Sequence, residues 1–127
     1  MLWAPACTYM AVLFFASSVP GDKLPSHMWD KLAHLLAYAV LGIFFLLPLC
    51  GGRLWQIRGL TAATAVLLAT VYGAFDEVHQ GFTPGRSPDV RDVVADCFGA
   101  AVGVAAILLL IAIARRLRVS VPVDDRG

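Results

Sequence analysis

Residues whose side chains can move protons, pair charges or bind cations gather in one short part of the chain. Residues 75–93 read FDEVHQGFTPGRSPDVRDV. Seven side chains in this stretch are ionisable: Asp76, Glu77, His79, Arg86, Asp89, Arg91 and Asp92. Carboxylates beside a histidine can form a general acid–base pair or hold a divalent metal ion. Arginine and lysine are the usual partners of phosphate and carboxylate groups. The stretch therefore has the residue types of a binding or catalytic site.

The spacing of these residues predicts that they lie on shared helix faces. Residues four apart in a helix stack one above the other, because each residue turns the helix by about 100°. Three pairs have this spacing: Asp30 and His34, Asp76 and Gln80, and Asp92 and Asp96. Lys31 is adjacent to the first pair. We expect three helices to bring these faces together at one end of a bundle.

Small residues continue two of these faces toward the middle of their helices. Ala62, Ala65 and Ala69 extend the face of Asp76, and Gly99 and Gly103 extend the face of Asp96. Small residues spaced four apart let transmembrane helices approach closely. We therefore expect Gly99 and Gly103 to be helix-packing positions, with the acidic face turned toward other helices and away from lipid.

Four apolar segments must position these faces: residues 2–19, 32–50, 60–75 and 93–114. Hydrophobic residues make up 59% of the chain and charged residues 15%, against roughly 45–50% and about 25% in soluble domains. Each segment approaches the roughly 20 residues that cross a bilayer. The prediction is an all-α fold, a polytopic membrane bundle with four transmembrane helices. Residues 1–118 form one domain, and residues 119–127 form a short cytoplasmic tail that we expect to be disordered.

Other classes of protein fit the composition less well. Four buried helices of a soluble protein would leave almost no polar face for water. The first segment lacks the basic start of a signal peptide, and three more spans follow, so we expect it to be retained. Cys7, Cys50 and Cys97 have no metal-ligand or disulfide spacing. No basic run with interleaved aromatic residues suggests nucleic-acid binding.

Basic residues near the span ends predict the orientation of the bundle. The side that holds both termini and the loop after residue 50 carries six arginines, and the other side carries four basic residues. The excess predicts that both termini are cytoplasmic and that residues 75–93 face outward. The acids near that end number six, Asp30 and Asp89 included, against three cations: Lys31, Arg86 and Arg91. Such a cluster needs protonated acids or a bound cation, because unpaired buried charge is costly.

The chain resembles the VanZ-like family of small bacterial membrane proteins. The resemblance rests on DKLAH at 30–34 followed by Tyr38, on DEVHQ at 76–80, on PGR at 84–86 and on the run DVRDVVADCFGAAVG at 89–103. Asp96 departs from the family pattern, in which many members have Asn. The resemblance implies a bacterial inner-membrane protein and a family named for a link to teicoplanin resistance. It implies no known reaction.

The candidate polar site comprises nine residues: Asp30, Lys31, His34, Asp76, Glu77, Gln80, Arg86, Asp92 and Asp96. The leading hypothesis is an outward-facing site for a lipid-linked or cell-envelope ligand, with Arg86 and Lys31 meeting its phosphate or carboxylate. One alternative is an enzyme using acid–base or metal chemistry, with His34 favoured over His79. Another is a purely structural charge network. No cofactor is predicted; a divalent cation stays open. The expected partners are the lipid bilayer, that ligand and a further copy of the chain.

Overall fold

The computed structural model describes residues 1–23 and 27–119, and within them the chain is all-helical. Its four helices are α1 (Ala4–Ser17), α2 (His27–Leu49), α3 (Gly59–Gln80) and α4 (Val90–Val119). Short 3₁₀ turns at Gly21–Lys23 and Leu54–Gln56 lie in the connections. The prediction of an all-α fold with four helices is confirmed. The predicted tail falls mostly outside the described residues.

Three helices are long and apolar enough to cross a membrane: α2 from Lys31, α3 over its whole length, and α4 as far as Leu117. The first helix is also apolar but has only 14 residues. At about 1.5 Å per residue it covers roughly 21 Å, less than the ~30 Å of a bilayer core. The predicted span over residues 2–19 is therefore a shorter helix than expected.

Specific residues begin and end the helices. Pro5 stands in the first turn of α1, where its missing N–H costs no hydrogen bond. After α2 the backbone turns through Gly51 and Gly52, which both have positive φ. Gly52 N–H donates to Leu47 O at 2.9 Å, the hydrogen bond that typically closes a helix on glycine. Asp89 precedes α4, and its Oδ1 accepts the Arg91 backbone N–H, as an N-cap residue does.

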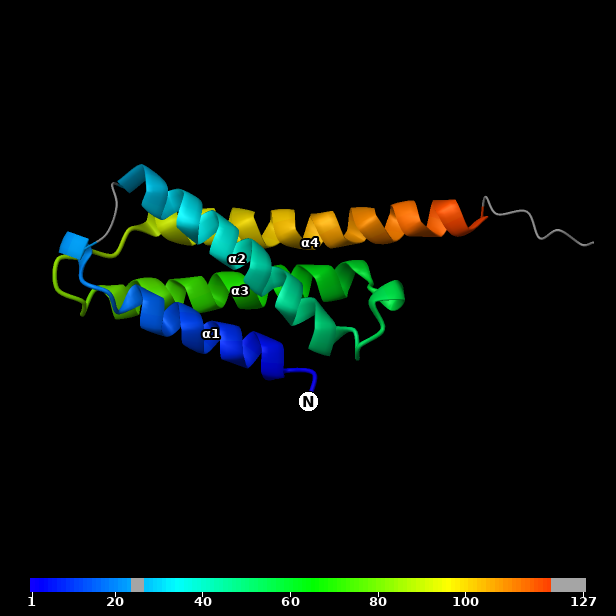
Figure 1. The fold of residues 1–127 in the computed structure, drawn as a ribbon, viewed down its shortest axis with the longest axis horizontal. Helices are drawn as coiled ribbons and strands as arrows, with labels where there is room; N and C mark the ends of the chain where they lie inside the picture. The colour runs from blue at the N-terminus through cyan, green and yellow to red at the C-terminus, as the bar shows by residue number, and fades with distance from the viewer. Residues whose placement is uncertain (24–26, 120–127) are drawn as a thin grey trace, which may run out of the picture.

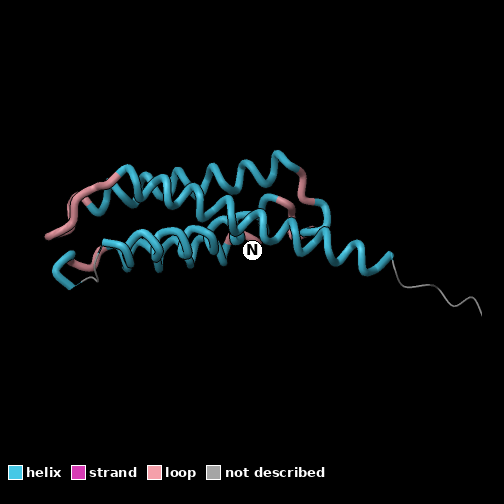
Figure 2. Tube along the Cα trace, turned by 90° about the horizontal axis from the view of Figure 1, so that it is seen from above, coloured by secondary structure: helices cyan, strands magenta, loops and turns pink. Residues whose placement is uncertain are grey.

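The helices form one elongated bundle (Figure 1). α3 and α4 run side by side in opposite directions, α2 crosses them diagonally, and α1 lies along α3 (Figures 1 and 2). The most extensive packing is between α2 and α4. The α1–α2 and α3–α4 connections meet at one end, where Gly21 N–H donates to Pro84 O. At the other end Arg115 Nη2 donates to Trp55 O, which joins the α2–α3 loop to the end of α4.

Small residues build much of the helix packing. A Cβ at Gly99 would overlap the Leu35 carbonyl, and a Cβ at Gly103 would overlap the Ala39 carbonyl. Both glycines therefore let α4 approach the backbone of α2. The predicted alanine stripe of α3 is buried, and it packs in one apolar core with larger side chains of α2 such as Tyr38 and Leu46. Many large apolar side chains point outward instead, among them Leu67 at 61% exposure, as a lipid-facing surface requires.

Candidate functional site

Buried polar residues collect at the end of the bundle where α3 ends and α4 begins. Six of the nine residues of the candidate polar site have less than a tenth of their surface exposed: His34, Asp76, Glu77, Gln80, Asp92 and Asp96. They come from α2, α3 and α4, so three helices supply one polar region. Buried charges are rare unless they are paired, and the contacts divide these residues into two neighbouring groups.

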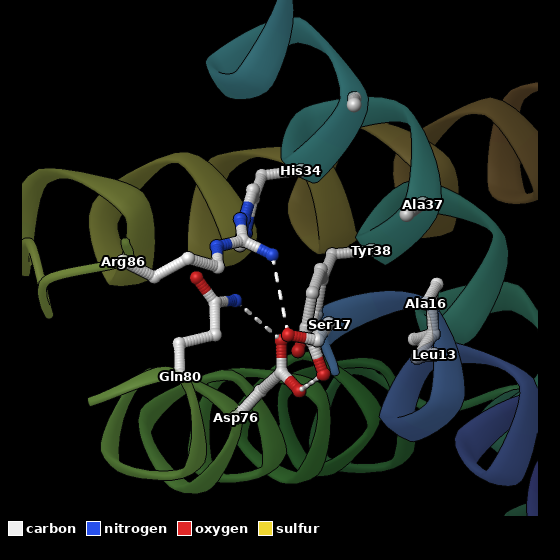
Figure 3. A pocket seen from close by; sticks show the side chains of 10 residues that line it. Leu13, Ala16, Ser17, His34, Ala37, Tyr38, Asp76, Gln80 and Arg86 are labelled. Atoms are coloured by element: carbon white, nitrogen blue, oxygen red, sulfur yellow. Dashed lines mark hydrogen bonds between the residues drawn. The ribbon is translucent and has the colours of Figure 1, made fainter. Parts of the chain in front are cut away.

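The first group surrounds the Asp76 carboxylate. Ser17 Oγ donates to Asp76 Oδ1 at 2.6 Å, and Gln80 Nε2 donates to Asp76 Oδ2 at 2.9 Å. Arg86 Nη1 donates to the Ser17 carbonyl at 3.3 Å (Figure 3). The end of α1 is thus tied both to α3 and to the α3–α4 turn. We call Ser17, Asp76, Gln80 and Arg86 the Asp76 group.

A pocket of about 180 Å³ opens beside the Asp76 group. All four members of the group line it, together with His34 and Tyr38 of α2 (Figure 3). Its remaining wall is apolar, from Leu13 and three alanines of α1 and α2. Tyr38 is 1% exposed, and its hydroxyl has no hydrogen-bond partner among the described residues. A buried hydroxyl without a partner is costly, so the pocket offers a polar ligand one unmet hydrogen bond.

The second group lies between α2, α3 and α4 and is centred on His34. The His34 Nδ1 atom lies 2.9 Å from Asp96 Oδ1, and the Nε2 atom lies 3.9 Å from Glu77 Oε1. Lys31 Nζ donates to Asp92 Oδ1 at 2.8 Å. We call His34, Glu77, Asp92 and Asp96 the His34 group. Three helices contribute to it: α2 supplies His34, α3 supplies Glu77, and α4 supplies the two aspartates.

Two buried acidic oxygens of the His34 group have no hydrogen-bond partner among the described residues. Glu77 Oε1 and Asp96 Oδ2 are buried and accept no hydrogen bond within the described part of the chain. Asp96 Oδ2 is directed at the backbone of Gly73, where a Cβ would overlap it. Glycine at position 73 therefore makes room for a fully buried carboxylate between α3 and α4. An asparagine at position 96 would occupy the same space without adding charge.

Lys31 and Asp89 form the outer border of this region. Lys31 Nζ lies 3.2 Å from Asp89 Oδ2, and both side chains are 41% exposed. The pKa of Asp89 is lowered from its ordinary value, first by the hydrogen bond from the Arg91 backbone and then by Lys31. The Asp89 backbone N–H also donates to Glu77 Oε2 at 2.8 Å. The start of α4 is thereby fixed against the end of α3.

The structure brings together eight of the nine predicted site residues, in two groups bordered by Lys31. The ninth, Asp30, stands in α2, and its side chain lies outside the described part of the structure. Lys31 is apart from the pocket, because it pairs with Asp89 and Asp92. His79 is also apart, since it stacks on Phe14 and bonds Ser18 on the exposed side of α3.

Sequence reasoning missed Ser17, Gly42 and Gly73. Ser17 is 59 positions from Asp76, so no local spacing links the two residues. A Cβ at Gly42 would crowd the Ala100 backbone at 2.9 Å, which makes Gly42 the α2 counterpart of the two α4 glycines. Gly73 stands three residues before Asp76 on the same face of α3, and the four-residue step from Ala69 to Gly73 is the signal that identifies it.

Comparison with known proteins identifies the family of the chain. No curated protein and no solved structure matches the chain. The family model described as VanZ/LLP1 matches residues 2–112. The match covers all four helices except the last turns of α4 and includes every residue of both polar groups. The chain is a membrane protein that belongs to the VanZ/LLP1 family.

Proposed function

We propose that this protein binds the phosphate-bearing headgroup of a lipid-linked cell-envelope molecule. The observation that carries the proposal is the pocket beside the Asp76 group, which combines one arginine and several polar groups with an apolar wall. Lipid headgroups join a charged part to an apolar part, so a ligand of this kind matches both sides of the pocket. Ionisable residues within membrane spans are functional candidates by default.

The size of the pocket favours part of a lipid over a free, drug-sized molecule. Pockets for drug-sized ligands measure roughly 300–1,000 Å³, whereas this one measures about 180 Å³. A phosphate with its nearest linking atoms fits that volume, and the lipid tail would then remain in the bilayer beside the exposed apolar side chains. Anchoring only the headgroup also limits the number of groups that the protein must order on binding.

The charges favour an anionic headgroup at Arg86. A guanidinium can bind two oxygens of a phosphate at once, and Arg86 is held at the pocket by the Ser17 carbonyl. Asp76, although acidic, already accepts hydrogen bonds from Ser17 and Gln80, so its role in this proposal is to order the pocket wall. The Tyr38 hydroxyl supplies a further hydrogen bond to the ligand.

The proposed location is the outer surface of the bacterial inner membrane. The polar groups lie at the end of the bundle where the α1–α2 and α3–α4 connections meet. The α2–α3 loop, with Arg53 and Arg58, and the end of α4 lie at the other end. The excess of arginine at the second end favours its placement in the cytoplasm. The termini would then be cytoplasmic and the pocket would face the envelope. A link to teicoplanin-type resistance is a further proposal, and it rests on the family alone.

Native mass spectrometry of gently extracted protein tests the proposed ligand. We expect one phosphate-bearing headgroup class to be enriched on the protein relative to the extracted membrane. Retained lipids in the same proportions as the membrane would contradict the proposal. An enzyme acting at the same groups would instead carry altered lipid products, and a purely structural network would retain no particular lipid.

A further inference from the structure

The His34 group places two hydrogen-bond acceptors face to face. His34 Nδ1 lies 2.9 Å from Asp96 Oδ1. A carboxylate only accepts hydrogen bonds, so Nδ1 carries a proton, and in the neutral ring Nε2 presents a lone pair. That lone pair is 3.9 Å from Glu77 Oε1, a buried oxygen without a hydrogen-bond partner in the described part of the chain. Either a proton or a metal ion between these two atoms would satisfy both of them.

Asp92 adds a third ligand to the same point. His34, Glu77 and Asp92 each offer one ligand atom, and these atoms all lie within 4.8 Å of one another. We propose that these three side chains bind one divalent metal ion, and that Zn²⁺ is the ion that fits best. Ligand atoms around tetrahedral zinc are roughly 3.4 Å apart, given zinc–ligand distances of about 2.1 Å. The separations between the three ligand atoms, which are all within 4.8 Å, must therefore shorten when the ion binds.

The surroundings of each ligand resemble the outer shell of a metal site. Asp96 holds the His34 ring through Nδ1, the Asp89 backbone N–H holds Glu77 Oε2, and Lys31 holds Asp92 Oδ1. Metal-binding histidines usually donate their second N–H to a carboxylate or carbonyl, which fixes the ring and raises its basicity. All three ligands are therefore oriented by neighbours that are not ligands themselves.

Charge and ligand type select the ion. Glu77, Asp92 and Asp96 are all buried in this group, and Lys31 Nζ pairs with Asp92. A divalent ion would offset the remaining negative charge. Imidazole suits zinc and similar transition metals, whereas magnesium and calcium prefer sites made only of oxygen ligands. Three protein ligands leave one tetrahedral position for water or another group.

Metal titration of the full-length protein in detergent, after removal of metals with a chelator, tests this site. We expect the wild-type protein to bind one Zn²⁺ per chain. Glu77→Gln should bind it at least tenfold more weakly, because the variant loses the anionic ligand but keeps an oxygen for the Asp89 N–H. His79→Gln is the matched control and should bind as the wild type does, since His79 lies outside the group. Co²⁺ in place of zinc should give the absorption bands of a tetrahedral site.

The outcomes separate this site from the lipid pocket. Arg86→Ala should keep its zinc even where it loses lipid, because Arg86 lies in the Asp76 group. A wild-type protein that takes up no zinc above the Glu77→Gln level overturns the proposal, as does an equal loss in His79→Gln. If Glu77→Gln fails to accumulate, the absorption spectrum of the wild-type protein with Co²⁺ tests the site instead. A spectrum identical to that of free aqueous Co²⁺ would overturn the proposed site. Tighter binding of Mg²⁺ than of Zn²⁺ would overturn the choice of ion.

Discussion

At the scale of single residues, both oxygens of the buried Asp76 carboxylate accept a hydrogen bond. The carboxylate accepts these hydrogen bonds from side chains of two helices, at 2.6 Å from Ser17 and 2.9 Å from Gln80. Hydrogen bonds that involve a charged group are shorter and stronger than neutral ones. The bond from Ser17 also connects the short α1 helix to the bundle, so its loss affects both a buried charge and the position of an element.

Ser17→Ala should destabilise the protein by about 0.6–2 kcal/mol. The lower figure is the average for hydrogen bonds between membrane helices, and the upper figure applies where a buried acceptor loses its partner. Ser18→Ala is the matched control and should change stability by less than about 0.5 kcal/mol, since its hydroxyl is exposed. Unfolding in mixed micelles measures both variants. Equal losses of stability in the two variants would contradict a stabilising role for the hydrogen bond between Ser17 and Asp76.

The sequence predicted individual residues well where their partners share a helix face. Asp76 and Gln80 bond one another across four residues, and His34 meets Asp96 because both face the same neighbouring helices. Spacing could not predict Ser17 or the separation of Lys31 from Arg86. Both depend on where α1 and the α3–α4 turn lie in space, which no local periodicity records.

At the scale of elements, the crossing of α2 over α4 depends on glycines. Gly99 and Gly103 of α4 meet carbonyls of α2, and Gly42 of α2 meets the backbone of Ala100. Such close contact lets many atoms attract one another, and this van der Waals packing is one of the forces that hold helices together in lipid. The same crossing brings Lys31 and His34 of α2 against Asp92 and Asp96 of α4.

Gly99→Ala should destabilise the bundle by about 1–3 kcal/mol, the usual cost of overpacking. The added methyl group would overlap the Leu35 carbonyl, so α2 and α4 must move apart. Gly59→Ala is the matched control, because a Cβ there meets no atom within 4 Å. Thermal unfolding in detergent compares the two variants. Equal melting temperatures would contradict this account of the crossing.

Element lengths were less predictable than element types. The apolar segments identified all four helices, yet α1 is shorter than the apolar stretch that contains it, and α3 and α4 extend beyond theirs to Gln80 and Val119. Hydropathy identifies the residues that can lie in lipid, whereas the first and last residues of a helix are set by capping and turn residues. Gly81 closes α3 and Asp89 opens α4, so both helices include polar residues that an apolar criterion leaves out.

At the scale of the whole molecule, the bundle has one polar end with two adjacent groups and one end rich in arginine. We expect the polar end to face the envelope. In a cysteine-free background, Ser87→Cys in the exposed α3–α4 turn should react with an impermeant maleimide on intact cells. Gln56→Cys in the α2–α3 loop should react only after permeabilisation. The reverse pattern would place the pocket on the cytoplasmic side and contradict the proposed orientation.

The central claim is that the pocket holds an anionic headgroup through Arg86. The most direct measurement is the lipid retained in native mass spectra of the wild type, Arg86→Ala and Arg91→Ala. Arg91 is a matched control, because it is an exposed arginine five residues further along the chain. The account predicts at least a tenfold loss of the enriched lipid in Arg86→Ala, about 1.4 kcal/mol of binding, and no loss in Arg91→Ala. Retention of the same lipid by a folded Arg86→Ala protein would contradict it.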